Sequence, residues 1–295
     1  MTDRAVVTAG ELRVVALLAT YNEERFIEGC LEHLVRNGVE IYLLDNDSTD
    51  DTLGIAERYL GRGVIGIEQL PRHGVYSWRP ILERKQQLSD ELDADWFIHV
   101  DPDERHLPPA GSTSLRAALR EVDHQGYNAV CFQEFTFVPT REEPDHDHPE
   151  YERTMRWYYP FLPWSPIARK LARRPEAVRL RKRGPPHRMN AWKKQPMPVD
   201  LASTAGHIVS FTGRRAYEPS FPMLHYLFLS VDHAIRKYAQ RRYDEREVAA
   251  GWHDARAYLR PADIVLQSQD ELRCRTGLAL DATAPLPFHP LFRQR

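Results

Sequence analysis

Two carboxylates separated by one residue follow an apolar segment in the first third of the chain. Asp101 and Asp103 flank Pro102, directly after the apolar run from Trp96 to Val100. Two acids in a tight turn can hold one hard cation such as Mg²⁺ or Mn²⁺, and that cation can bridge a diphosphate. The alternative is an ordinary turn with solvated acids. We predict the metal site because two further polar clusters are expected beside this one.

These two clusters also end apolar segments. Thr20 to Glu23 follows residues 13–19, and Asp45 to Asp50 follows residues 41–44. In a parallel sheet, ligands bind outside the carboxyl ends of the strands. We therefore expect the three clusters to converge on one crevice. Their side-chain oxygens also suit helix-capping turns, a role compatible with ligand binding.

The elements that position these clusters follow a β-α repeat. Apolar runs predict strands at 13–19, 41–45, 64–68 and 96–100, with helices between them, an order typical of a parallel sheet with right-handed crossovers. The second half is less regular. We expect a helix at 112–122, a strand at 128–138, two short strands within 207–230 and a charged helix at 231–258. A boundary near residue 138 divides the chain into 1–138 and 139–295, as two units or one continuous domain.

The composition excludes several classes of protein. Of 295 residues, 42% are hydrophobic and 28% charged, as in soluble globular proteins, and the net charge of -2 gives no general attraction to nucleic acid. The three cysteines lie far apart and predict neither a zinc site nor a disulfide framework. No signal peptide or membrane-spanning run is recognisable, so we expect a cytoplasmic protein.

The run from Leu17 to Thr52 resembles the opening of family 2 glycosyltransferases, with their T-Y-N-E and V-D-D-G-S-T-D-D-T signatures. Gly74, Arg84-Lys85 and the segment FIHVDPDE at 97–104 resemble further motifs of that family, so the match covers residues 13–108. The resemblance implies a GT-A-like α/β fold: a Rossmann-type, mostly parallel sheet flanked by helices, with an irregular acceptor region and a C-terminal helix. It also implies a nucleoside-diphosphate sugar donor, a divalent metal and inversion at the anomeric carbon.

The resemblance assigns roles by position. It places the donor on Thr20, Tyr21, Glu23, Asp45, Asn46, Asp101 and either Arg79 or Arg84, and the metal on Asp101 and Asp103. Two departures are present, since Asn46 replaces the usual second Asp and Asp47 the usual Gly. Asn46 can still accept from a base N–H, which favours a UDP- or dTDP-linked sugar. Glu104 is an alternative metal ligand.

The C-terminal half resembles a bacterial branch of the same family in short segments. These are Ala205-Gly206-His207, Tyr217 to Pro219 and His225-Tyr226. In GT-A enzymes a histidine from this part often completes the metal shell, and imidazole suits manganese. We therefore expect His225 or His207 to bind the metal. The alternative for each is an ordinary buried or surface histidine.

An inverting transfer needs a general base near the acceptor hydroxyl. Asp200 is the first candidate because the resemblance implies a base well downstream of the D-x-D motif. Glu134 is the competitor, and Asp145 and Asp147 are further candidates. The acceptor itself stays open among a glycan, a lipid-linked saccharide and a small molecule.

The stretch 169–188 is rich in Lys and Arg. It suits an anionic acceptor or anionic lipid head groups, which would give peripheral membrane contact, and a solvated loop is the alternative. Two other functions compete with glycosyl transfer. A sugar-phosphate nucleotidyltransferase would have a glycine-rich loop after the first strand, where this chain has Ala19 to Asn22. A non-catalytic nucleotide-sugar-binding protein would not need both Asp101 and Asp103.

Overall fold

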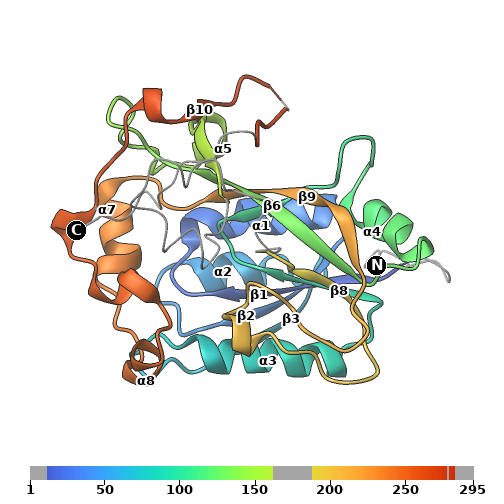
Figure 1. Cartoon of the computed structure of the whole chain (residues 1–295). Coiled ribbons are helices and arrows are strands. Elements are labelled where there is room, and N and C mark those ends of the chain that lie inside the picture. The colour runs from blue at the N-terminus through green and yellow to red at the C-terminus, as the bar shows by residue number, and fades with distance from the viewer. Residues whose placement is uncertain (1–11, 162–187, 278, 283–295) are drawn as a thin grey trace, which may run out of the picture.

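The computed structural model describes residues 12–161, 188–277 and 279–282, and Figure 1 shows their arrangement. The strands are β1 (Val14–Thr20), β2 (Glu40–Asp45), β3 (Val64–Gln69), β4 (Trp96–Val100), β5 (Glu104–His106), β6 (Ala129–Phe137), β7 (Trp157–Pro160), β8 (Ala191–Lys193), β9 (Ala216–Tyr226) and β10 (Arg273–Cys274). The helices are α1 (Glu24–Arg36), α2 (Thr52–Glu57), α3 (Trp78–Glu91), α4 (Leu115–His124), α5 (Tyr151–Thr154), α7 (Val231–Ala234) and α8 (Glu245–Ala249). A π-helical turn, η3 (Ile235–Ala239), continues α7, and short 3₁₀ turns include η2 (Ala202–Thr204).

The N-terminal half forms the predicted parallel sheet. Its strand order is β4-β1-β2-β3, with β1 parallel to both neighbours. Thr20 lies beside Asp45 in the register of β1 and β2, and Leu18 lies beside Val100 of β4. The α/β fold class predicted from the sequence is confirmed, and the three strand ends lie at the same edge of the sheet.

Helices cover both faces of these strands, as the nearly continuous apolar sequence of β1 requires. Ala16 and Leu18 pack in one hydrophobic cluster with residues of α1 and α4. Val15 and Leu17 point to the opposite face and pack with Leu82 of α3. In Figure 1, α3 runs along one side of the sheet and α1 and α2 lie on the other.

The second half completes the same sheet. β8 pairs antiparallel with β4 and with β6, and β6 pairs with β7 and in parallel with β9. The two short strands expected within 207–230 are one long strand, β9, which also pairs with β5 directly after the D-x-D turn. Strands from both sides of residue 138 therefore share one sheet.

The charged helix expected at 231–258 is interrupted. Residues 231–239 form α7 and η3, and α8 begins only at Glu245. The Asp244 side chain accepts hydrogen bonds from the backbone N–H groups of Arg246 and Glu247, so it caps a new helix. The predicted basic stretch lies outside the described residues except for Arg188. Among the described helices, none is both long and apolar enough to cross a bilayer.

Candidate functional site

The polar strand ends converge as predicted. Thr20, Asn46, Asp101 and Asp103 all line one cavity of about 120 Å³, which we name the inner cavity. A larger cavity of about 740 Å³, the outer cavity, adjoins it. Both cavities are lined by Tyr21, Glu23, Lys237 and Arg241. The parallel pairing of β1 with β2 and β4 brings these ends together.

Asp45 holds the turn after β2 and lines neither cavity. Its Oδ1 lies 3.3 Å from the Thr20 hydroxyl, which donates to it, and its Oδ2 accepts from the backbone N–H of Ser48 at 3.0 Å. The neighbouring Asn46 donates through Nδ2 to the Leu70 carbonyl at 2.8 Å. Asn46 lines the inner cavity. The Asp45 carboxylate instead accepts hydrogen bonds within the turn, which is the capping-type role considered from the sequence.

A residue with a left-handed backbone conformation lies two positions after the end of β1 and of β2. Asn22 has φ 54° and Asp47 has φ 60°, a region in which Asn and Asp are enriched among residues other than glycine. The Asp47 carboxylate accepts from the backbone N–H of Arg72 at 2.6 Å. Asp47 therefore supplies the left-handed turn at the position where the resembled family has Gly, and it also anchors the chain after β3.

The metal candidate Asp103 lies in a buried network of charged groups. Its Oδ2 accepts from Nζ of Lys237 at 2.8 Å and lies 3.3 Å from Nε2 of His225. The same Lys237 nitrogen donates to Oε2 of Glu23 at 3.2 Å. On its other side, Nδ1 of His225 lies 2.6 Å from Oε1 of Glu134. Residues far apart in the chain thus neutralise one another around Asp103.

This network shifts the protonation of its members. Burial alone would lower the pKa of His225, but the Asp103 and Glu134 carboxylates raise it to about 10. Burial raises the pKa of Glu23 to about 7, although the Lys237 ammonium opposes the rise. Burial also acts to raise the pKa of Asp103, yet Lys237 and His225 outweigh it and hold that pKa far below its usual range.

The predicted metal ligands do not fit a divalent cation as they are folded. Within the described ranges, no three His, Cys, Asp or Glu side chains form a group that could hold a metal ion. The Asp103 Oδ2 atom already faces the Lys237 ammonium and the His225 imidazole, and a positive charge so close disfavours a divalent cation beside the same carboxylate. Asp101 and His207 line the inner cavity without completing such a group. The neighbouring Glu104 lies 3.4 Å from a guanidinium nitrogen of Arg188.

Two guanidinium groups that the motifs did not indicate lie beside the network. Arg72 lies over the ring of Tyr21 at 3.6 Å and Arg241 over the ring of Tyr76 at 4.4 Å, and each also lies within 6 Å of the other ring. Burial and then the Arg241 charge lower the pKa of Arg72. Among the described residues, no carboxylate lies within ion-pair distance of either guanidinium. Glu23 interacts electrostatically with Arg241 without a direct ion pair, and the two close positive charges favour an anion beside them.

The cation at α3 is Lys85 rather than either predicted arginine. Its buried ammonium lies 3.0 Å from Nδ1 of His99 and donates to the Val100 carbonyl at 3.2 Å, in the wall of the inner cavity. Burial lowers the pKa of Lys85 to about 8. Arg84 points away, since it pairs with acids on β3 and on its own helix, and Arg79 lies over Trp252. Neither arginine lines the inner or the outer cavity.

The predicted base candidates lie in different surroundings. The Asp200 carboxylate accepts from the backbone N–H of Ser203 at 3.0 Å and from its hydroxyl, and it lines neither cavity. Glu134 is buried beneath His225 and accepts from Arg188 at 2.9 Å. Asp147 lines the outer cavity, where arginines of α1 and η3 hold both of its oxygens, and the Asp145 carboxylate accepts from the Asp147 backbone N–H.

The Ala205-Gly206-His207 segment turns the chain toward the inner cavity. Ala205 and Gly206 have φ values of 53° and 80°, and a Cβ on Gly206 would lie 2.9 Å from Nε2 of His99. A glycine is therefore required by both the backbone and the close approach. The turn places His207 in the wall of the inner cavity.

Comparison with known proteins agrees with this site. Residues 16–79 match the profile of glycosyl transferase family 2. A lipopolysaccharide core biosynthesis glycosyltransferase, LpsC of Rhizobium meliloti, is 30% identical over 113 residues, which are 38% of this chain and 36% of the relative. The chain thus spans about a third of that relative's length. Residues 16–79 contain the first two strand-end motifs, so the resemblance to family 2 that the sequence predicted is confirmed for this segment.

Two solved structures superpose on part of this chain. TarS of S. aureus superposes with a TM-score of 0.41 at 15% identity, covering 73% of this chain and 37% of TarS. Glucosyl-3-phosphoglycerate synthase of Mycobacterium tuberculosis, solved with Mn²⁺, uridine diphosphate and glucosyl-3-phosphoglycerate, superposes with a TM-score of 0.29 at 19% identity. That match covers 43% of this chain and 45% of the synthase.

Proposed function

We propose that the protein is a glycosyltransferase that moves a sugar from a nucleoside diphosphate to an acceptor hydroxyl with inversion. The observation that carries the proposal is the convergence of Thr20, Asn46, Asp101 and Asp103 on the inner cavity. The family 2 match over residues 16–79 covers the first two of these strand ends.

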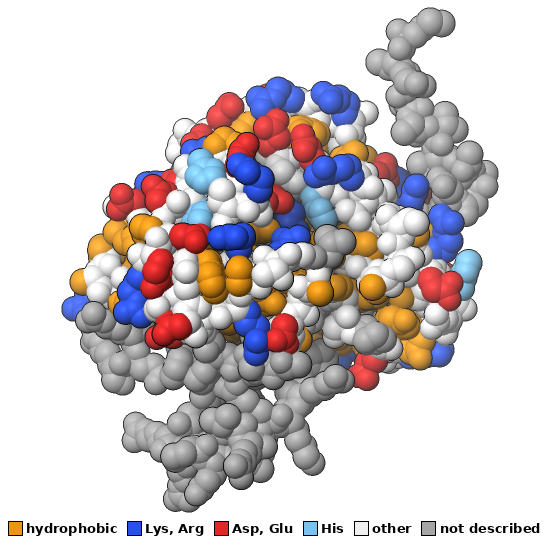
Figure 2. Space-filling model, turned by 90° about the horizontal axis from the view of Figure 1, so that it is seen from above, with side chains coloured by type: hydrophobic (Ala, Val, Ile, Leu, Met, Phe, Trp, Pro, Cys, Tyr) orange, Lys and Arg blue, Asp and Glu red, His pale blue; other side chains and the backbone are white. Residues whose placement is uncertain are grey.

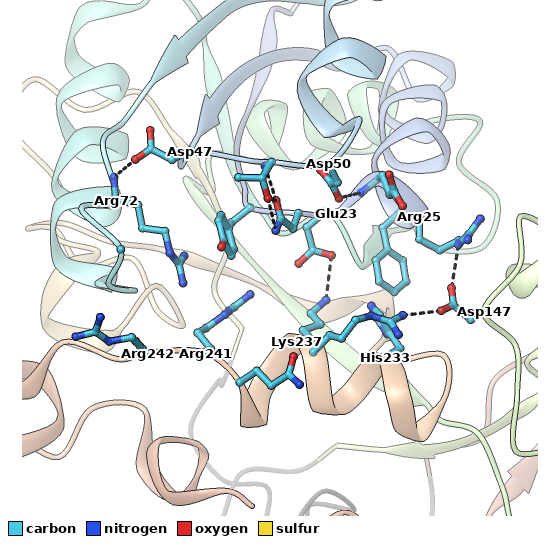
Figure 3. A pocket seen from close by; sticks show the side chains of 18 residues that line it. Glu23, Arg25, Asp47, Asp50, Arg72, Asp147, His233, Lys237, Arg241 and Arg242 are labelled. Atoms are coloured by element: carbon cyan, nitrogen blue, oxygen red, sulfur yellow. Dashed lines mark hydrogen bonds and ion pairs between the residues drawn. The ribbon is translucent and has the colours of Figure 1, made fainter. Parts of the chain in front are cut away.

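The donor is proposed to lie across the two cavities. Its base lies near Asn46 and Tyr21, with a uracil or thymine base favoured by the amide acceptor, and its ribose lies near Asp101. The diphosphate lies where the cavities join, beside Lys237 and Arg241. The outer cavity, whose lining residues are drawn in Figure 3, takes the acceptor.

The transfer itself exchanges one bond for another. The acceptor oxygen bonds to the anomeric carbon as the bond from that carbon to the diphosphate breaks, and the electron pair leaves with the diphosphate. The acceptor proton passes to a carboxylate; of the candidates from the sequence, Asp147 lines the outer cavity, whereas Asp200 and Glu134 line neither cavity. Fixed positive charge at the departing diphosphate stabilises the charge that develops there.

Thermal unfolding with a panel of UDP-, dTDP-, GDP- and ADP-sugars tests the proposal. A ligand present at about 100 times its Kd stabilises the folded state by about 2.7 kcal/mol, which raises the midpoint by several degrees. We expect at least one nucleotide sugar to do so, and to be hydrolysed slowly to nucleoside diphosphate and free sugar. Nuclear magnetic resonance of the released sugar reports its anomeric configuration.

Adjacent residues on α3 supply a matched pair of variants. Lys85→Met removes an ammonium from the inner cavity, and Arg84→Met removes a guanidinium from outside both cavities. We expect donor affinity to fall at least about tenfold in the first variant only, as for a lost charge-assisted hydrogen bond. Release of pyrophosphate from a nucleoside triphosphate would instead identify a nucleotidyltransferase, and binding without any hydrolysis or transfer a non-catalytic binding protein.

A further inference from the structure

Lys237 lies where the inner and outer cavities join. Its ammonium donates to Asp103 at 2.8 Å and to Glu23 at 3.2 Å, and it lies 4.6 Å from the centre of the Phe26 ring. Figure 3 shows Lys237 rising from η3 toward Glu23, with Arg241 beside it. One side chain from the C-terminal half therefore occupies the point between the carboxylates of two strand ends.

The backbone around Lys237 is unusual. Residues 235–239 form a π-helical turn, and such turns are rare and occur frequently at functional sites. Beyond its two carboxylate contacts, an ammonium group has one more N–H donor. Because Lys237 lines both cavities, that donor is available to a ligand that spans them.

Arg72 and Arg241 extend this positive charge. Both guanidinium groups lie within 6 Å of the rings of Tyr21 and Tyr76, and neither pairs with a carboxylate of the described residues within 4.0 Å. Arg72 donates through Nη1 to Oδ1 of Asn46 at 3.4 Å, and a guanidinium has further N–H donors for a phosphate oxygen. The diphosphate of a nucleotide sugar carries one negative charge on each phosphate, which these two arginines match.

We propose that Lys237, Arg72 and Arg241 together bind the donor diphosphate in place of a divalent metal ion. The inference rests on the proposed function, and it replaces the cation that the family resemblance implies. Lys237 compensates the Asp103 and Glu23 carboxylates, and the two arginines compensate the phosphates. When the glycosidic bond to the donor breaks, the extra negative charge on the departing diphosphate develops beside cations that are already fixed.

Calorimetric titration of the full chain with UDP tests the proposal directly. The titration is run in excess EDTA and again in Mn²⁺, and uridine is the probe without phosphates. We expect the affinity for UDP to agree within about threefold between the two buffers, a difference below 1 kcal/mol by the relation of about 1.4 kcal/mol per factor of ten. Binding of UDP that is absent in EDTA and restored by Mn²⁺ would overturn the proposal.

Single-residue variants test which cations bind the diphosphate. Lys237→Met and Arg241→Met are each expected to weaken UDP binding in EDTA by roughly tenfold to a hundredfold, the range for a lost charge-assisted hydrogen bond, with uridine binding unchanged. Lys237→Arg retains the charge and is expected to restore most of the affinity. Lys193→Met is the matched control, since Lys193 pairs with Asp123 at 2.6 Å and lines neither cavity.

Three outcomes distinguish the inference from the function on which it rests. UDP affinity that is unchanged in Lys237→Met and Arg241→Met would remove these residues from the site. The wild-type comparison of EDTA with Mn²⁺ stands even where a variant fails to fold. If no nucleoside diphosphate of the uridine, thymidine, guanosine or adenosine series binds in either buffer, the proposed function fails and the inference fails with it.

Discussion

The acidic strand ends and the cationic C-terminal segment reach the same cavity by different routes. The strand ends, at Thr20 to Glu23, Asp45 to Asp47 and Asp101 to Asp103, lie together because parallel pairing of adjacent strands aligns them. The cationic segment, residues 231–242, has no strand and is interrupted after its π-helical turn. It reaches the strand ends only through side chains, among them Lys237 and Arg241.

The difference shows that the chemical role of a recognisable motif depends on the side chains that surround it in the folded protein. The D-x-D pair alone indicates a metal site. Lys237 changes the chemistry of that pair because it places a positive charge 2.8 Å from Asp103, where it disfavours a divalent cation. On the face that Figure 2 shows, acidic and basic side chains are interspersed among the described residues, so this face has no comparable concentration of one charge.

Breaking the link between the two regions is expected to have the largest effect. Asp103→Asn leaves the buried Lys237 and His225 charges poorly compensated, so we expect the free energy of unfolding to fall by about 3–5 kcal/mol in chemical denaturation. The double variant Asp103→Asn/Lys237→Met is expected to be clearly more stable than the sum of the two single losses predicts. Additive losses would contradict an energetic link between the regions.

A more exposed Lys–Asp pair provides the control for this double-mutant cycle. Lys193 and Asp123 also form a Lys–Asp contact, but their side chains are 44% and 19% exposed, against 9% and 7% for Lys237 and Asp103. Exposed ion pairs are worth about 0–1 kcal/mol because water already solvates the charges. We therefore expect the Lys193→Met/Asp123→Asn cycle to show a coupling energy in that lower range.

A second contact between the halves is the cap that Glu247 of α8 forms on α3. Its carboxylate accepts from the Ser77 hydroxyl at 2.6 Å and from the backbone N–H groups of Trp78 and Arg79 at 2.9 and 2.7 Å. Because these are the free donors at the start of the helix, we expect Glu247→Ala to lower the free energy of unfolding by about 2 kcal/mol. A change below 0.5 kcal/mol in denaturant unfolding would show that the cap is unimportant.

The same cap predicts a pH dependence with a definite sign. Burial opposes ionisation of Glu247, but hydrogen bonds from His253 and Ser77 lower its pKa from 4.5 to about 2. The stabilisation is therefore complete above the unfolded pKa and is lost as the pH falls from about 4.5 toward 2. The isosteric variant Glu247→Gln should remove this part of the acid dependence of unfolding.

Substitution of Asp200 is expected to have the smallest effect on turnover, and it tests whether this residue is the general base. Its carboxylate caps the turn at Ser203 and lines neither cavity, so we expect Asp200→Asn to change donor turnover by less than about threefold and stability by about 1 kcal/mol. A fall in kcat of about 100-fold or more, with KM unchanged, would instead identify Asp200 as the general base.

The parallel half of the fold could be predicted from local pattern. Buried parallel strands are apolar on both faces, so β1, β2 and β4 appear as apolar runs, and the polar residues after them mark the strand ends. The long strand β9 was predicted as two short strands, and the helix at 231–258 as continuous. Their boundaries depend on long-range pairing and on caps such as Asp244, which periodicity does not reveal.

The sequence by itself determined the fold class, the family resemblance of residues 16–79 and the meeting of Thr20, Asn46, Asp101 and Asp103, because strand order and strand ends are local properties of the chain. Only the tertiary structure determined which cationic side chains lie beside these residues. Lys237 lies 134 residues from Asp103 and 214 from Glu23, and no spacing rule connects positions so far apart. The choice of Lys85 over Arg84 was also tertiary, since the rotation of α3 directs one side chain into the cavity and its neighbour toward Glu68.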